Sequence, residues 1–561
     1  MVDRKAAERR WTYGLNVFER YMEEVLSHAG MAFQKWESAR EAVEASPDVL
    51  IAALAGEDEE TTAVLWEYAE RGGTILSCGG LNPFAVKLGS ELAGVYGSGY
   101  ARFGEAYGKA DSVRFLSARP WRVKDAGQGL QSELGLLHKE SPDGVEIGAA
   151  LQQFAIGQGR LVRWSVDIAD TIVRLQQGTE PVLTDGVPAR DGSGPINENI
   201  LKADDRCAMD WDHDRLHTET GYPYYAYPYA DYWRELFLGR LLRTVVDKGL
   251  TLPFVGYWPE GIRQVAMISH DSDGNQDIHA EATLELLKEC GIHSTWCMIE
   301  SGYSPSIYDR VKAEGHELAF HYNALDSQNG KWDEAEFDRQ LEWLKKAAGL
   351  PQVHSNKNHY TRFEGWSELF AWCEKNGVES DQTRGPSKKG NVGFLFGTCH
   401  PYYPISWSNE QNRLHDVVEI SFTTQDMDLS PHWSDSSIVL PFLETAAQVE
   451  GIAHFLFHQV HIQGKESVRD ALRKVVREAR NRGFVFWTGK QVNDWHRARR
   501  KLAVLSVDPQ GAVQVEGAGE AKGAVVWIPV ADSYQPAPGE AVEERFGVRC
   551  RKQSVASILS V

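Results

Sequence analysis

Two carboxylates that follow a predicted buried strand have the types and the spacing to do chemistry. Residues 265–268 are an apolar run without alternation, which is typical of a parallel strand covered on both faces. The run leads into Asp271, Ser272, Asp273 and Gly274. If the chain is still extended there, Asp271 and Asp273 lie on one face, where they repel each other unless they share a cation or a proton. A helix-capping loop is the alternative, because Asp and Gly also suit caps and turns.

Polar residues also stand at the ends of the later predicted strands. They are His321, His359, Arg362, Asp381, His400, His454 and His458. A single histidine on a strand is more often a hydrogen-bonded core residue than a ligand. Several polar strand ends in succession favour a shared site instead. Aspartate and histidine together are suitable ligands for zinc or another divalent ion, and a catalytic site would leave one position open for water.

Strands and helices alternate along the part of the chain that carries these residues. Helices that end at or next to glycine are predicted over residues 279–290, 305–314, 333–347 and 364–376. The alternation predicts a parallel sheet, and the number of units suits a distorted (β/α) barrel of seven or eight strands. In such barrels the strand ends carry the chemistry, so we expect the polar residues to meet at one mouth.

The first 200 residues predict a separate α/β unit. A strand at residues 49–54, an acidic helix start, a closing Gly72-Gly73 and a strand at residues 74–77 form a βαβ unit. The unit resembles the flavodoxin-like, doubly wound domains of the class I glutamine-amidotransferase type that are appended to many carbohydrate enzymes. Those domains need a glycine two residues before the nucleophilic cysteine, where this chain has Leu76. We therefore expect Cys78 to be structural and the domain to be non-catalytic.

These patterns divide an α/β chain of 561 residues into four segments. Residues 1–200 form the N-terminal domain, residues 201–255 a connecting segment with a helix, and residues 256–498 the barrel. Residues 499–561 contain short alternating or apolar runs separated by glycine and proline, which predict a small β-sandwich-like domain. We expect that last domain to pack against the rest, although a carbohydrate-binding role stays open.

Composition narrows the function. A formal net charge of -20 disfavours nucleic acids and anionic membrane surfaces as partners. The seven scattered cysteines contain no CxxC pair, which argues for a reducing compartment. The charged N-terminus lacks an apolar signal region, and no apolar run is long enough to span a membrane. We therefore expect a cytoplasmic protein, and homo-oligomerisation stays open.

Residues 260–490 resemble the polysaccharide deacetylase family, which is NodB-type and forms carbohydrate esterase family four. Its first motif is usually TFDDG, and residues 269–274 read SHDSDG, similar to a divergent HDxD branch. His321 matches the first histidine of the second motif, but Leu325 replaces the second histidine. Leu456 and His458 match the Leu-x-His motif. The positions of the third and later motifs hold His359, Arg362, Asp381, Thr383 and His400.

The resemblance implies metal-assisted hydrolysis of an N- or O-acetyl group on a sugar. It implies that Asp271 is the base, that Asp273 and His321 bind the metal, and that His458 is the acid. For the position left by Leu325 we expect His359 to be the third ligand, because it lies in the nearest densely polar strand end.

The remaining candidates are expected to bind substrate. Arg362 and His400 could bind substrate hydroxyls or a carboxylate, with a surface or structural role as the alternative for each, and Asp381 is expected to bind substrate as well. The sequence thus predicts a hydrolase that removes an acetyl group from a carbohydrate and uses a divalent metal, with zinc expected. Two alternatives stay open: a non-hydrolytic carbohydrate-binding or scaffolding protein on a decayed barrel, and a metal-independent amide or cyclic imide hydrolase.

Overall fold

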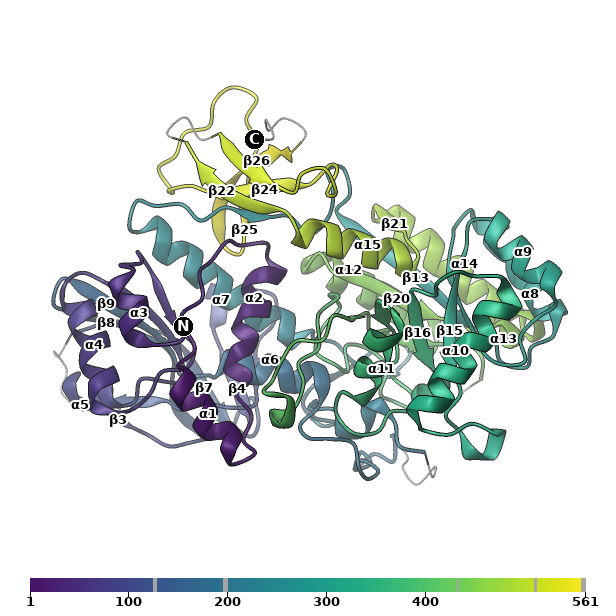
Figure 1. Cartoon of the computed structure of the whole chain (residues 1–561), viewed down its shortest axis with the longest axis horizontal. Helices are drawn as coiled ribbons and strands as arrows, with labels where there is room; N and C mark the ends of the chain where they lie inside the picture. Colours follow the sequence, from purple (N-terminus) through teal and green to yellow (C-terminus); the bar gives the residue numbers. More distant parts are fainter. Residues whose placement is uncertain (125–128, 195–199, 431–432, 509–511, 556–561) are drawn as a thin grey trace.

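The computed structural model describes residues 1–124, 129–194, 200–430, 433–508 and 512–555. Figure 1 shows an N-terminal α/β unit in purple and blue, a second α/β unit in teal and green, and a small sheet in yellow near the end of the chain. Helices and parallel strands alternate in the second unit, so the α/β class predicted from the sequence is confirmed. Among the described residues, no helix has both the length and the apolar character needed to cross a membrane.

The N-terminal unit is built on a mixed seven-stranded sheet. Three neighbouring strands are parallel: β1 (Leu50–Ala52), β2 (Thr74–Cys78) and β9 (Gly159–Trp164). The other four pair antiparallel: β8 (Glu146–Ile156), β7 (Leu130–Lys139), β4 (Gly99–Arg102) and β5 (Val113–Phe115). The predicted βαβ unit is confirmed by β1, α4 (Glu59–Glu70) and β2.

The expected doubly wound sheet is wrong for this unit. Strands β7 and β8 follow each other without a helix between them, and β8 turns into β9 through two residues, so both pairs must be antiparallel. A doubly wound sheet needs a crossover helix between successive parallel strands.

The second unit contains a curled sheet in which every strand pair is parallel. Its order is β18 (Val418–Glu419), β17 (Ser380–Asp381), β16 (Ser355–Asn358), β15 (Glu317–Tyr322), β14 (Thr295–Met298), β13 (Gln264–Asp271), β20 (Ile452–Leu456) and β19 (Thr424–Gln425), with β21 (Phe484–Phe486) also paired to β13. The two edge strands, β18 and β19, are separated in the chain by residues 420–423 only. Within that segment Ile420 N donates to Asp381 O at 2.8 Å and Thr423 N donates to His454 O at 2.9 Å. One short segment therefore links the two edges of the sheet, which is curled into a partial barrel.

Helices cover the outside of this barrel sheet. They include α8 (Asp277–Cys290), α9 (Pro305–Ala313), α10 (Glu334–Ala348), α11 (Glu368–Asn376), α12 (Val439–Gln448), α14 (Glu466–Asn481) and α15 (Gly489–Arg500). Helices α8, α10 and α11 each end at a glycine in the left-handed conformation, at Gly291, Gly349 and Gly377. The helix ends predicted from glycine are therefore confirmed there.

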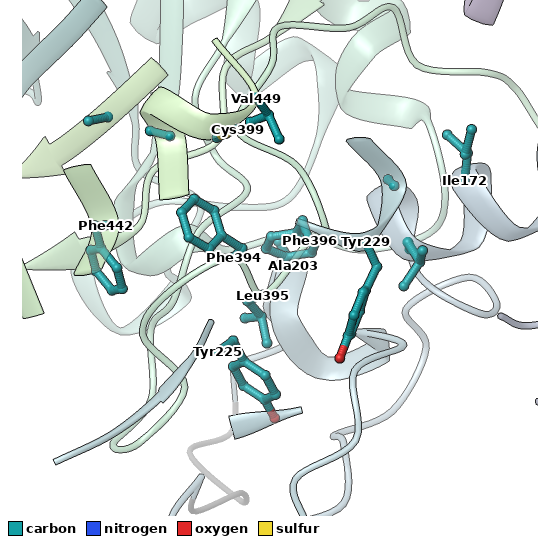
Figure 2. Packing of buried hydrophobic residues seen from close by; sticks show 14 of the residues in the cluster. Ile172, Ala203, Tyr225, Tyr229, Phe394, Leu395, Phe396, Cys399, Phe442 and Val449 are labelled. Carbon is teal, nitrogen blue, oxygen red and sulfur yellow. The ribbon is translucent and has the colours of Figure 1, made fainter. Parts of the chain in front are cut away.

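A long connection packs the two units together. After α6 (Ile168–Gln177) the chain runs to α7 (Tyr229–Val246), and within this connection Tyr224 and Tyr225 are buried while Tyr222 and Tyr227 are half-buried. Figure 2 shows Tyr225 and Tyr229 in one apolar cluster with Phe394, Phe396 and Phe442 of the barrel unit. The backbone of Tyr225 pairs with residues 392–394, so the connection is anchored to a loop of the barrel.

The C-terminal sheet is small and antiparallel. Its order is β12 (Phe254–Val255), β24 (Val525–Pro529), β26 (Val548–Ser554) and β25 (Val542–Arg545), and a hairpin of β22 (Ala503–Val507) and β23 (Val513–Glu516) lies in the same part of the chain. Strand β12 comes from the end of the connecting segment. The connection therefore contributes a strand to the last sheet as well as a path between the units.

Candidate metal centre

Four of the predicted site residues meet at the carboxyl ends of the barrel strands. Asp271 is the last residue of β13, Asp273 lies two residues beyond it, His321 lies on β15 and His359 directly follows β16. Both carboxylates face the same side, since His458 Nε2 lies 3.9 Å from Asp271 Oδ2 and 3.7 Å from Asp273 Oδ2. The shared face predicted for the two aspartates is confirmed.

His321 Nε2, His359 Nδ1 and Asp273 Oδ1 form a nearly equilateral triangle. His359 Nδ1 lies 3.3 Å from His321 Nε2 and 3.4 Å from Asp273 Oδ1, and His321 Nε2 lies 3.5 Å from that same oxygen. Ligand atoms held about 2.0–2.1 Å from a tetrahedral zinc ion are about 3.3–3.4 Å apart. The triangle therefore has the dimensions of one face of a zinc coordination shell, with its remaining corner left for water or substrate.

The two imidazoles are oriented so that unprotonated nitrogens face this triangle. His321 Nδ1 donates to the carbonyl of Lys357 at 2.8 Å, which leaves Nε2 without a proton. His359 Nε2 donates to Gln328 Oε1 at 3.0 Å, which leaves Nδ1 without one. Such outer hydrogen bonds fix the tautomer and the direction of metal-binding histidines.

The protonation states also fit a cation. Burial lowers the pKa of His359, which favours the neutral ring that can coordinate. Burial acts to raise the pKa of Asp273, but hydrogen bonds from His321 and His359 in their protonated forms, together with the charge of His458, hold that pKa well below its usual range; a bound cation would take the place of those imidazole protons. Asp273 Oδ1 is buried and has no hydrogen-bond donor among the described residues. An ionised, unsatisfied oxygen facing two lone pairs is a site for a positive ion.

Asp271 has a different partner, the buried ammonium of Lys357. Lys357 Nζ lies 3.2 Å from Asp271 Oδ1 and donates to Ser269 Oγ at 2.6 Å. Burial acts to raise the pKa of Asp271, yet the charge of Lys357, followed by those of His321 and His458 when these rings are protonated, lowers it overall. Asp271 is therefore ionised beside the triangle, with Oδ2 3.7 Å from His321 Nε2. Sequence reasoning missed Lys357, although a lysine inside a barrel strand needs a carboxylate partner.

His458 reaches the centre from the opposite side, and Asp426 holds it. His458 Nδ1 donates to Asp426 Oδ2, while the backbone N of His458 donates to Asp426 Oδ1 at 2.7 Å. Burial acts to lower the pKa of His458, but Asp426 and the two aspartates raise it to about 10. His461 Nε2 lies 4.0 Å from Asp426 Oδ2, so these three side chains could form a second ion site. The hydrogen bond between His458 and Asp426 makes an imidazole–carboxylate pair the better description.

The side chains of the other three predicted residues are engaged in contacts away from the triangle. Arg362 is near the centre, because its backbone N bonds to His359 O at 3.1 Å, but its guanidinium pairs with Glu364. Asp381 is fully buried in the barrel and accepts from Asn356 Nδ2 at 2.7 Å and Thr383 Oγ1 at 2.9 Å.

His400 lies in a separate buried cluster. Its ring centroid is 5.1 Å from that of His28 and 4.5 Å from that of Tyr257, and its Nε2 bonds to Val449 O at 2.8 Å. Substrate binding by Asp381 or His400 does not fit these positions, because both side chains are enclosed by core residues.

Comparisons with known proteins give structural similarity only. No family model matches the sequence, and no curated protein matches it either. Solved structures that are similar include a peptidoglycan N-acetylglucosamine deacetylase, Bc1960, with 18% identity over 43% of this chain and 91% of that chain and a TM-score of 0.27. The polysaccharide deacetylase Bc1974 from Bacillus cereus has 16% identity over 40% and 91%, with a TM-score of 0.26. The allantoinase PuuE has 11% identity over 43% and 93%, with a TM-score of 0.32.

Proposed function

We propose that this protein is a metal-dependent hydrolase that removes an N- or O-linked acetyl group from a carbohydrate. One observation carries the proposal: Asp273, His321 and His359 present three ligand atoms 3.3–3.5 Å apart, and Asp271 and His458 flank them from two sides. The sugar part of the proposal comes from the sequence motifs, and the hydrolytic part comes from this arrangement.

The donor set favours zinc. Two imidazoles and one carboxylate at tetrahedral spacing are a common catalytic zinc environment, whereas magnesium and calcium prefer oxygen ligands. When bound there, a zinc ion would polarise the acetyl carbonyl and acidify a water molecule.

Asp271 is placed to take the proton of that water. It is ionised, with Lys357 Nζ 3.2 Å from its Oδ1 and His321 Nε2 3.7 Å from its Oδ2. The proton would pass to a carboxylate oxygen as the water oxygen bonds to the acetyl carbon.

His458 is placed to supply the other proton. Its Nε2 lies 3.9 Å from Asp271 Oδ2 and 3.7 Å from Asp273 Oδ2, and the ring carries a proton at neutral pH, because its pKa is raised to about 10. With Nδ1 held by Asp426, its Nε2 would give a proton to the sugar nitrogen or oxygen as the bond to the acetyl carbon breaks.

The position of His359 weakens the scaffold alternative. Leu325, which replaces the usual second histidine, is buried before the short helix η4 (Asp326–Gln328). His359 supplies a nitrogen beside His321 instead. A decayed site would not be expected to retain three candidate ligands, a candidate base and a candidate acid that are linked by contacts shorter than 4 Å.

Metal analysis combined with product analysis tests the function. Purified protein would be assayed for metal by mass spectrometry and for acetate release from N,N′-diacetylchitobiose and acetylated xylan. We expect about one zinc per chain and acetate release that a chelator removes and zinc restores. Turnover without metal would support the amide hydrolase alternative, and neither metal nor turnover would support the scaffold.

A further inference from the structure

Tyr360 is a half-exposed aromatic residue beside the metal centre. It directly follows His359, and the two ring centroids lie 4.7 Å apart at an interplanar angle of 88°. Half of the residue, 50%, is exposed, whereas His359 and Thr361 on either side are buried. A large side chain this open beside a buried polar cluster does not serve to fill the core.

The backbone that presents Tyr360 is unusual. Tyr360 has φ 56° and ψ 21°, and Thr361 follows with φ 51°, so two successive residues other than glycine are left-handed. This conformation is unfavourable for side chains with a Cβ, and more so for β-branched threonine. Strained turns of this kind concentrate at functional sites, where the surrounding structure enforces them.

The ring of Tyr360 is held from two sides. The His359 ring meets it at a right angle, and Lys202 Nζ lies 5.6 Å from its centroid. Lys202 belongs to the connection between the two units, and its backbone pairs with Arg362. A cation near an aromatic ring is attracted to it, so Lys202, from a separate segment, and the neighbouring His359 ring both restrict the Tyr360 ring. A restricted aromatic surface loses little conformational entropy when a ligand binds.

From this geometry we infer that Tyr360 determines substrate specificity by packing its exposed ring against the sugar ring that carries the acetyl group. The inference rests on the proposed function and adds the residue that selects a cyclic substrate. A pyranose has a face of C–H groups, and an aromatic ring offers it a flat apolar surface. Packing beside His359 would bring the neighbouring acetyl group to the three-atom triangle.

The variant Tyr360→Asn tests the inference, because asparagine removes the ring and tolerates the left-handed backbone better than alanine does. We expect KM for N,N′-diacetylchitobiose to rise about tenfold with kcat nearly unchanged, since the lost contact is uniform binding. The kcat/KM for ethyl acetate, which has no ring, should stay within twofold. Tyr360→Phe should behave like the unchanged protein, and Tyr13→Ala, which removes an exposed tyrosine from the N-terminal region, serves as the matched control.

Equal losses on both substrates, or no change in KM for the saccharide, would overturn the inference. A protein that hydrolyses neither substrate would contradict the proposed function, and calorimetric titration with N,N′-diacetylchitobiose then decides about Tyr360 separately. Binding that Tyr360→Asn weakens about tenfold supports the inference. Binding of equal strength in both proteins, or no binding to either, overturns it.

Discussion

His359 Nδ1 lies 3.3 Å from His321 Nε2, and in the neutral tautomers that their outer hydrogen bonds favour, neither nitrogen carries a proton. Each ring uses its other nitrogen to donate, to the Lys357 carbonyl for His321 and to Gln328 for His359. Two facing lone pairs beside an ionised carboxylate repel one another unless a positive charge lies among them. The outer hydrogen bonds therefore keep the two imidazoles ready for a cation.

Removing the third ligand should abolish tight metal binding. His359→Ala leaves two ligand atoms, and we expect the zinc dissociation constant to rise at least about a hundredfold. Competition with a chromophoric chelator measures this constant. Asp426→Asn is the control, since Asp426 contacts His458 rather than the triangle. Equal zinc affinity in His359→Ala and the unchanged protein would contradict the ligand assignment.

Gln328 should matter for metal affinity although it lies outside the triangle. Gln328→Leu removes the acceptor that fixes the His359 ring, and loss of such an outer partner typically weakens metal binding about 10–100-fold. The same chelator competition applies. Gln352→Leu is a matched control, because Gln352 bonds to Gly377 O at the end of α11. If both glutamine variants bind zinc alike, Gln328 does not position the ligand.

Asp426 should be needed for turnover but not for metal. In Asp426→Asn the His458 ring loses the charged partner that raises its pKa, so the ring carries the proton less often and is less well oriented. Loss of a general acid typically costs about 10²–10⁴ in rate. We expect kcat for acetate release to fall by about that factor while the zinc content stays at one per chain. A variant with unchanged kcat would exclude His458 as the acid in the form described.

The free energy of unfolding should fall as the pH is lowered from about 6.5 to 4, because His28, His400 and His496 form a buried cluster. Burial lowers the pKa of His400 to about 4, and burial holds the pKa values of His28 and His496 well below the usual range. Below the ordinary pKa the unfolded chain takes up protons that the folded chain does not. Each such histidine therefore removes about 1.4 kcal/mol of stability per pH unit in this window.

The variant His400→Gln tests how much of this pH dependence comes from His400. Glutamine retains a donor for Val449 O but does not titrate. Thermal unfolding followed at several pH values should give a shallower loss of stability for the variant than for the unchanged protein. Parallel curves would show that His400 is not kept neutral by burial.

The residues of the centre differ in how far the sequence could reveal them. Asp271, Asp273 and His321 follow apolar strands long enough to recognise, so their place at strand ends could be inferred. The place of Asp426 could not be inferred from the sequence, because it follows β19 (Thr424–Gln425), a two-residue strand without an apolar run. His359 was found because a position near Leu325 needed a replacement ligand, and the structure brings it beside His321.

Asp381 and His400 were predicted to bind substrate, but the structure buries both of them away from the centre. Both stand at the end of a polar segment that resembles the true site residues in sequence. Whether such a side chain faces the open mouth or the core depends on contacts with distant elements, such as His28 on α2 (Met22–His28). For the same reason the N-terminal sheet departs from expectation, since the β7–β8 pairing replaces a crossover that local patterns had favoured.

X-ray absorption of the zinc-loaded protein tests the central claim most directly. We expect a first shell of two nitrogen ligands with imidazole scattering and one carboxylate oxygen at about 2.0–2.2 Å, completed by water. We also expect that His359→Ala loses one imidazole from that shell. A shell of oxygens alone, or a spectrum that His359→Ala leaves unchanged, would contradict the claim that Asp273, His321 and His359 bind the ion.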